Sequence, residues 1–387
     1  MQLGHRETRA AFALLALAAT ATGAAAGSPL DDTGVGWCVD TAAGTIGVAC
    51  AGTGQDGETG RDVTANHPKN GPLGFDFVKV CNSGQLAGEG TCGVRPAQGP
   101  GPDDWGCTMD RHTGLVWELR THDGGLIDAS KKYTNLGGGA STDASGLVAA
   151  VNAQGLCGAS DWRMPTRSEL LGKLDLGTRV RNFDDGDWFP DNMNSFGEAG
   201  SYWTSQDVVW DPGEGWAIDD SLAQVYVSPK SYQFNFVRLV REPDPHTVSP
   251  RFVVRGQQVR DAQTRLVWRH CVEGMAWNGT TCKGKPELYT WPDALAHAQA
   301  AAAKSGQAWR VPNVKELESL VDPSVGYPSI DATIFPGTPA QYTWTSSPFS
   351  IGGPTSAYAN IVDFGTGVVY IDAWTVQRPV RLVRDPG

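Results

Sequence analysis

The sequence predicts an α+β fold built from two tandem copies of one domain, each with short antiparallel sheets and two helices. Three observations predict it. Four blocks recur in the same order at a nearly constant separation. Short alternating or β-branched segments outnumber helical ones. Gly and Pro, 48 and 24 of the 387 residues, are abundant between them. Few helices, several short strands and long Gly/Pro loops are typical of an antiparallel α+β domain.

Four blocks carry the repeat. They pair residues 110–117 with 261–268, 161–175 with 308–322, 203–205 with 344–346, and 237–241 with 380–384. A position that recurs is first a requirement of the fold. A residue that is present in one copy alone is a better candidate for a specific function.

The repeats set the predicted domain organisation. Residues 1–26 are similar to a secretory signal peptide, because basic residues precede a short apolar run and alanines follow it. That run is too short to span a bilayer, and no later stretch is apolar enough. The other predicted parts are a leader at 27–104, a first domain at 105–242, a linker at 243–249 and a second domain at 250–387. We expect a periplasmic, secreted or cell-surface protein without a membrane span.

The chain has eight cysteines, and their number and spacing predict disulfides. An even number in an exported protein favours a disulfide framework, and the lack of a C-x-x-C argues against a metal site. The predicted pairs join neighbouring cysteines: Cys38–Cys50, Cys81–Cys92, Cys107–Cys157 and Cys271–Cys282. Because the leader is poor in Leu and Ile, we expect it to bury little core and to depend on its disulfides. Its most ordered parts are expected at residues 55–62 and 74–80.

Each repeat is expected to open with a short strand and to continue with a helix. These elements are predicted at residues 115–117 and 143–154 in the first copy, and at 266–268 and 292–304 in the second. Gly155 and Gly306 follow the two helices, and Pro292 stands in the first turn of the second one. Proline at the start and glycine just past the end are typical helix boundaries.

The W-R-x-P block predicts a strand, a sharp turn and the start of another helix. The residue before a proline favours extended backbone. A capping box follows, from Thr166 with Glu169 in one copy and from Asn313 with Glu316 in the other. Because the block recurs, we assign structural roles to its members. They are Trp162, Arg163, Pro165, Thr166, Glu169, Trp309, Arg310, Pro312, Asn313 and Glu316.

The remainder of each repeat is expected to hold this second helix and short strands. The helices are predicted at residues 167–174 and 314–321. The strands are predicted at residues 201–205, 223–227, 235–241, 343–346, 359–364, 368–371 and 379–384.

These motifs resemble a known family. The motifs are Trp117, residues 161–166, 169–170, 202–205 and 237–241 in repeat one, and residues 271–282, 309–313, 330–331, 335–336 and 380–384 in repeat two. Over both repeats the chain resembles the Lcl C-terminal domain family. The segments 55–62 and 74–80 are also similar to the leader that often precedes such domains.

The resemblance implies a fold and a kind of function. The W-R-x-P-T turn is similar to one in C-type-lectin-like and sulfatase-modifying-factor domains, which implies two tandem C-type-lectin-like domains. The named family member is a bacterial collagen-like adhesin whose C-terminal domain binds sulfated glycosaminoglycans. Here there is no collagen G-x-y tract. The net charge of −11 also disfavours sulfated glycans, nucleic acid and anionic membranes as partners.

Aromatic residues without a counterpart in the other repeat are the candidates for ligand binding, because exposed aromatic faces stack on sugars or anchor protein partners. The alternative for each is packing within a strand. The candidates are Trp188, Trp210, Trp216, Tyr226, Tyr232, Tyr358, Tyr370 and Trp374, together with Phe234, Phe236, Trp277 and Phe349.

The densest acidic cluster contains Asp184, Asp187 and Asp191, whose oxygens could hold Ca²⁺. EF-hand spacing is absent, so a solvated turn is the alternative. No other cofactor is expected.

Known catalytic motifs are absent, and the cysteines are expected to be paired, so we do not expect an enzyme. The expected function is binding of a glycan or a surface protein by an exported protein. The alternative is a structural envelope or appendage component that makes protein–protein contacts. Neither reading fixes the oligomeric state.

Overall fold

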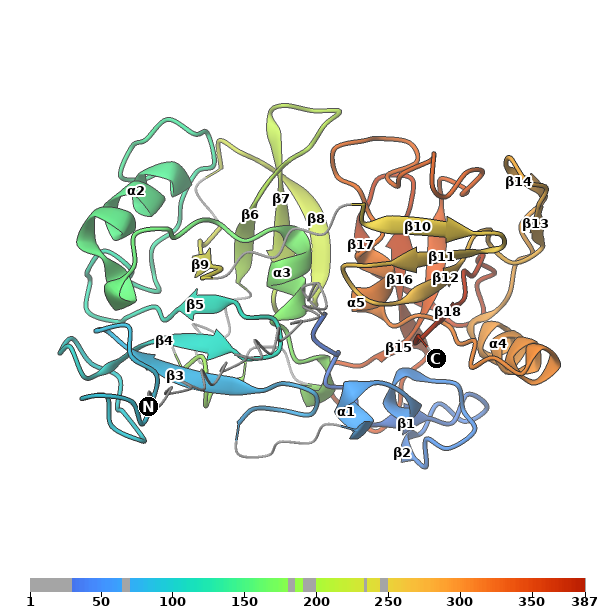
Figure 1. Ribbon diagram of the computed structural model, residues 1–387, viewed down its shortest axis with the longest axis horizontal. Coiled ribbons are helices and arrows are strands. Elements are labelled where there is room, and N and C mark those ends of the chain that lie inside the picture. Colours follow the sequence, from blue (N-terminus) through green and yellow to red (C-terminus); the bar gives the residue numbers. More distant parts are fainter. Residues whose placement is uncertain are drawn as a thin grey trace, which may run out of the picture.

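The computed structural model describes residues 30–64, 70–179, 185–190, 200–232, 235–243 and 250–386. The two repeats form α+β units that lie side by side, and the leader runs along one edge of both (Figure 1). The α+β class with small antiparallel sheets, which the sequence predicts, is confirmed.

Each unit contains a four-stranded antiparallel sheet with the same order of strands. In the first unit the order is β3 (Phe77–Cys81), β4 (Trp105–Asp110), β5 (Val116–Glu118) and β9 (Val240–Arg241). In the second it is β10 (Phe252–Arg255), β11 (Gln258–Asp261), β12 (Val267–Arg269) and β18 (Val383–Arg384). The leader therefore supplies β3, the first strand of the first unit's sheet.

A six-stranded sheet joins the two units. Its order is β15 (Tyr342–Phe349), β16 (Tyr358–Asp363), β17 (Val369–Ala373), β8 (Gln224–Pro229), β7 (Glu214–Asp219) and β6 (Ser201–Asp207). Three strands come from each unit, and the junction is the antiparallel pair Val225 and Val369. In Figure 1, β8 and β17 face each other at the centre of the molecule.

The residues at this junction are equivalent positions of the two repeats. The repeated Trp203 pairs with Ala217, and its counterpart Trp344 pairs with Ile361. Counting along the strands makes Ile218 equivalent to Val362, and the next pairing makes Val225 equivalent to Val369. Equivalent residues that pair with each other define a local two-fold axis at the junction.

The helices begin and end where capping chemistry requires. Helix α2 (Ala144–Gln154) is capped by Asp143 and ends at Gly155, and α4 (Trp291–Ser305) is capped by Thr290 and ends at Gly306. Both glycines are left-handed, with φ of 71° and 66°. Both predicted capping boxes are confirmed, at the starts of α3 (Arg167–Gly172) and α5 (Val314–Glu318). The remaining elements are β1 (Cys38–Val39), β2 (Ile46–Val48), η1 (Asp56–Glu58), α1 (Arg61–Thr64), η2 (Leu156–Gly158), η3 (Leu176–Thr178), β13 (Met275–Trp277) and β14 (Cys282–Gly284).

Some boundaries differ from the prediction. Helices α3 and α5 end earlier than residues 174 and 321. Of the strand predicted at 235–241, only Val240–Arg241 belongs to a sheet, while Asn235 and Phe236 form isolated bridges to Tyr133 and Tyr202.

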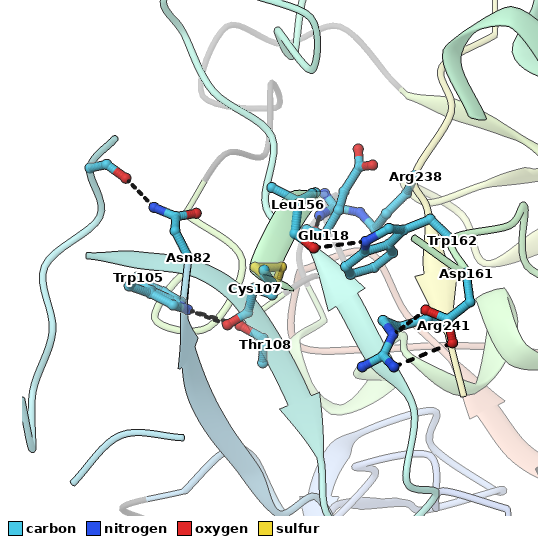
Figure 2. Close-up of a disulfide and its surroundings, with 12 residues drawn as sticks. Asn82, Trp105, Cys107, Thr108, Glu118, Leu156, Asp161, Trp162, Arg238 and Arg241 are labelled. Atoms are coloured by element: carbon cyan, nitrogen blue, oxygen red, sulfur yellow. Dashed lines mark hydrogen bonds and ion pairs between the residues drawn. A yellow bond between two sulfur atoms is a disulfide. The ribbon is translucent and has the colours of Figure 1, made fainter. Parts of the chain in front are cut away.

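All four predicted disulfides are present. Figure 2 shows Cys107–Cys157, which ties β4 to η2, the turn that follows α2. Around it, the indole of Trp105 donates to Cys107 O at 2.9 Å and that of Trp162 donates to Leu156 O at 3.0 Å. Disulfides persist in oxidising compartments, so these four indicate a protein that works outside the cytoplasm.

The leader is part of the main hydrophobic core, so the expectation that it buries little is wrong. Val35 and Phe75 are fully buried, and Phe77 is nearly so. They share one core cluster with Trp117 of the first unit and Trp268 of the second. The leader buries aromatic residues here despite its low content of Leu and Ile.

A buried ion pair also crosses between the units. Arg167 Nε lies 2.9 Å from Glu318 Oε1, and both side chains are 1% exposed. The guanidinium also lies over the Trp216 ring, 4.2 Å from its centroid. In the repeat alignment Arg167 corresponds to Val314, and Glu318 to Leu171. The pair therefore joins two residues that each occur in one copy only.

Within the described ranges, no helix combines the length and the hydropathy that a bilayer crossing requires.

Candidate functional site

The second unit carries a surface groove of about 710 Å³. Three parts of the chain line it: the leader turn at 41–44, the segment 349–358 at and after the end of β15, and two residues of the β17 region, Ile371 and Trp374. The leader and the second repeat therefore build this groove together.

Backbone hydrogen bonds hold the leader turn against the neighbouring loop. Ile46 N donates to Pro354 O at 2.9 Å, and Ser356 N donates to Gly44 O at 2.8 Å. Gly44 has φ of 73°, and a Cβ at this position would lie 2.9 Å from Ser356 O. The turn therefore requires glycine both for its backbone conformation and for its close approach to the loop.

Side-chain hydrogen bonds to β1, the strand that precedes the turn, also hold the turn in place. The side-chain amide of Gln55 donates to Val39 O at 2.7 Å, and its oxygen accepts from Val39 N at 2.9 Å. Gln55 is itself buried. This side chain thus substitutes for a neighbouring strand at the start of the groove wall.

Aromatic residues of the groove divide into buried and exposed ones. Phe349 and Trp374 are buried, and Trp374 stacks on Trp291 with 5.1 Å between ring centroids. By contrast, Tyr358 is 48% exposed, and the aliphatic Ile351 beside it in the groove lining is 39% exposed. A rigid aromatic base with one exposed tyrosine can bind a flat or apolar face of a ligand.

Among the residues that the structure describes, those that line the groove include no Asp, Glu, Lys, Arg or His. Its polar side chains are hydroxyls, from Thr41, Ser350, Thr355 and Ser356, together with Tyr358. Ser356 already donates its hydroxyl to Phe349 O. The arrangement can accept and donate hydrogen bonds to neutral groups, but it offers no charge to an ionic ligand.

Of the predicted ligand residues, Tyr358 and Trp374 meet in the groove, together with Phe349. Tyr370, which is 50% exposed, pairs with Ile361 on the neighbouring strand. Tyr358 is three residues before Ile361, and side chains alternate along a strand. Tyr370 therefore lies on the opposite face of the sheet from Tyr358.

The aromatic candidates of repeat one do not form a shared groove. Trp216 is fully buried under Arg167, so it contributes packing and no ligand surface, which corrects its expected role. Trp188 packs against Phe77, and burial raises the pKa of the half-buried Tyr226. Trp210 and Tyr232 are exposed on separate loops.

The predicted calcium cluster is described only in part. Asp184 and Asp191 lie outside the described residues, as does Phe234. Asp187 is exposed, and its N–H donates to Asp185 Oδ1 at 2.8 Å.

A different acidic group was missed in the sequence. Asp32, Asp56 and Asp62 are buried, and each offers a carboxylate oxygen within 4.8 Å of the others. All three belong to the leader, which was expected to bury little. The available signal was the segment 55–62, which has three acidic residues, Asp56, Glu58 and Asp62, and two glycines in a part of the leader that we expected to be ordered.

A second cavity, of about 660 Å³, lies between the units and is lined by helix α3 of the first unit and by the segment 319–323 that follows α5 in the second. Two of its charged side chains are engaged with other residues: Glu169 binds Arg163, and Arg251 binds Asp261 with an N–O distance of 2.8 Å. We therefore assign this cavity to the packing of the units.

Comparison with known families adds one finding. The family described as the Lcl C-terminal domain matches residues 106–241 and again residues 257–384. A search of curated proteins gave no match, and a search of solved structures gave none either.

Proposed function

The chain belongs to the Lcl C-terminal domain family, with two tandem copies, and from that premise we propose that it is a non-catalytic, exported binding protein. Its site is the groove of the second unit, and its ligand is a neutral glycan. It works in the periplasm or at the cell surface, and its units act as lectin-like domains.

The observation that carries this proposal is the combination of exposed aromatic surface and hydroxyls without ionisable acids or bases. A sugar ring presents an apolar face that packs on an aromatic side chain and hydroxyls that exchange hydrogen bonds with the rim. Tyr358 supplies the ring. The hydroxyls of Thr41 and Thr355 supply partners, while those of Ser350 and Ser356 already donate to Gly352 O and Phe349 O.

The charge of the chain separates this ligand from that of the collagen-like adhesin. Recognition of sulfate depends on Arg and Lys, which make charge-assisted hydrogen bonds. The groove lining has neither, and the net charge is −11. A neutral glycan thus fits the groove better than a sulfated one.

The test is a glycan array with neutral and sulfated members, followed by titration of the best binder. Tyr358→Ala should weaken binding by at least about tenfold, since a hot-spot aromatic contributes about 2 kcal/mol or more. Tyr370→Ala is the matched control, because it is equally exposed on the other face of the sheet, and it should bind as the parent does. Equal affinities for the parent and Tyr358→Ala, or binding of sulfated glycans alone, would refute the proposal.

One observation favours the alternative, a structural component that makes protein–protein contacts. Val209 and Trp210 of the first unit and Val325 and Tyr327 of the second are exposed apolar residues, from 38% to 74%. The two loops touch, because a Cβ on Gly326 would lie 3.4 Å from Trp210 Cε3 and 3.7 Å from Val209 Cγ1. Together they form an apolar patch across both units, of the kind that binds proteins.

Sedimentation velocity over a range of concentrations tests this alternative. Self-association that is abolished by Val209→Ser with Tyr327→Ser, and unchanged by Tyr358→Ala, would favour the structural role. A monomer at every concentration would leave binding of a glycan as the better account.

A further inference from the structure

The acidic group of the leader lies where three of its segments meet the second unit. Asp32 follows the start of the described chain, Asp56 begins η1 and Asp62 lies in α1. Asp32 and Asp56 are also bound to the second unit, through the side chains of Asn313 and Ser347 respectively. All three aspartates are buried, with exposures of 6%, 1% and 2%.

The three carboxylates differ in how well they are satisfied. Asp32 accepts four N–H hydrogen bonds, from the backbone of Thr33, Arg61 and Asp62 and from the side chain of Asn313. Asp56 Oδ2 accepts from the hydroxyls of Thr33 and Ser347.

Asp62 is the exception. Its Oδ2 lies 3.5 Å from the Thr33 hydroxyl, whereas its Oδ1 is buried without a hydrogen-bond partner among the described residues. A buried carboxylate oxygen that lacks a partner is costly.

The charges around the group do not balance. The buried Lys315 lies beside the group, but its ammonium donates to two backbone carbonyls, Asp32 O and Gly172 O. Lys315 also interacts with Asp31 and Asp175, so it does not neutralise the three carboxylates by itself. Buried carboxylates at this separation repel one another, so the group needs a proton or a cation between its oxygens.

We propose that Asp56 and Asp62 bind one Ca²⁺ ion, with Asp32 supplying a third negative charge beside it. The donor set consists of carboxylate and hydroxyl oxygens, which hard cations such as Ca²⁺ prefer. A divalent cation would offset the negative charge that Lys315 does not neutralise. Asp32 is already saturated by N–H donors, so it acts through its charge and through the backbone that it fixes.

The ion connects the leader to the groove. Asp56 follows Gln55, which holds β1 and through it the leader turn at 41–44. Its other partner, Ser347, lies in β15 two residues before Phe349. Calcium bound here would therefore stabilise the leader and the groove wall together, without contact with the groove ligand.

The first test is calorimetric titration of the metal-free protein with Ca²⁺, together with thermal unfolding in Ca²⁺ and in EDTA. We expect one ion per chain. At a Ca²⁺ concentration 100 times the Kd, the equilibrium should shift about 100-fold toward the folded state. The absence of binding and of any EDTA effect would overturn the proposal.

Isosteric variants locate the ion. Asp62→Asn should abolish the binding and the response to EDTA. Asp187→Asn, in the other acidic segment, should retain both. Loss of Ca²⁺ binding in Asp187→Asn would place the ion in the other acidic segment and refute the site. An Asp62→Asn protein that still binds Ca²⁺ would also refute it.

If Asp62→Asn does not fold, diffraction from crystals of the unmodified protein soaked in Tb³⁺ decides the question. An anomalous peak between Asp56 and Asp62 supports the site. No peak there overturns it. Neither readout requires the glycan ligand, so the calcium site and the groove can fail separately.

Discussion

At the scale of single residues, duplicated and single-copy positions do different work. The duplicated Arg163 and Arg310 make the same bidentate ion pair, with Glu169 and Glu316, and these pairs hold the capping boxes. The single-copy Arg167 and Glu318 instead bind each other across the units. The duplicated residues thus stabilise the fold within each unit, whereas the residues that differ between the copies form the contact between the units.

Breaking the Arg167–Glu318 pair should be strongly destabilising. Glu318→Ala leaves a buried, uncompensated guanidinium, which should cost about 3–5 kcal/mol of unfolding free energy in urea denaturation. Arg111→Ala, which removes a partly exposed ion pair with Asp76 at 3.8 Å, is the control and should cost about 0–1 kcal/mol. If replacing both partners, Arg167→Met with Glu318→Leu, costs as much as Glu318→Ala, the argument from the uncompensated charge is wrong.

Asp175 should make stability fall as the pH rises. Burial raises its pKa to about 7, with Asp185 adding to the effect and Lys315 opposing it. An acid whose folded pKa exceeds its unfolded pKa binds more protons when folded, so its stabilisation is complete below about pH 4 and is lost as the pH rises through 7. Asp175→Asn keeps a side-chain oxygen to accept from Gly177 N and should flatten the slope of unfolding free energy between pH 5 and 8. If the slope is unchanged in Asp175→Asn, the pH dependence of stability comes from other groups.

Local chemistry was predictable at this scale, but burial was not. The caps of Thr166 and Asn313 depend on residues three positions apart, which the sequence displays directly. Whether Trp216 or Trp374 reaches a surface depends on strands that are distant in sequence. The burial of Asp62 depends on the second unit, so its role could not be predicted from the leader alone.

At the scale of elements, Cys107–Cys157 should contribute more than the disulfide of the second unit. It closes a separation of 50 residues, against 11 for Cys271–Cys282. Loop-closure entropy predicts about 4 kcal/mol for the first and about 3 kcal/mol for the second. Denaturation of the two double Cys→Ala variants checks the order. A larger loss for the Cys271–Cys282 variant would mean that native-state contacts, and not loop length, dominate.

Elements with a local signature were predicted, and those with a non-local origin were not. Helices α2 and α4 carry their caps in the sequence. Strand β7 was missed because four consecutive residues are buried, which removes the alternation of a half-exposed strand. The segment 235–239 has strand-like residues, but it forms bridges to separate parts of the chain.

At the scale of the whole molecule, the two units should unfold together. One core cluster contains residues of the leader and both units, and one sheet crosses the junction. We expect a single calorimetric transition whose van't Hoff enthalpy equals the measured enthalpy. Two resolved transitions would show that the units are independent.

The tandem repeat was predictable from four blocks, but the joined sheet was not. The contact that continues the sheet is one residue pair, Val225 with Val369. A valine in an edge strand does not indicate which other strand it will pair with. Likewise, the poor Leu and Ile content of the leader concealed that Phe75 and Phe77 complete a core belonging to other segments.

The two-fold junction has an evolutionary consequence. Because β8 and β17 meet at equivalent residues, an ancestor with a single unit could have paired with a second copy of itself through this edge. Fusion of the two genes would then have removed the dependence of assembly on concentration. It would also have freed each half to mutate alone, which a homodimer cannot do, and an unsymmetrical contact such as Arg167 with Glu318 could arise only afterwards.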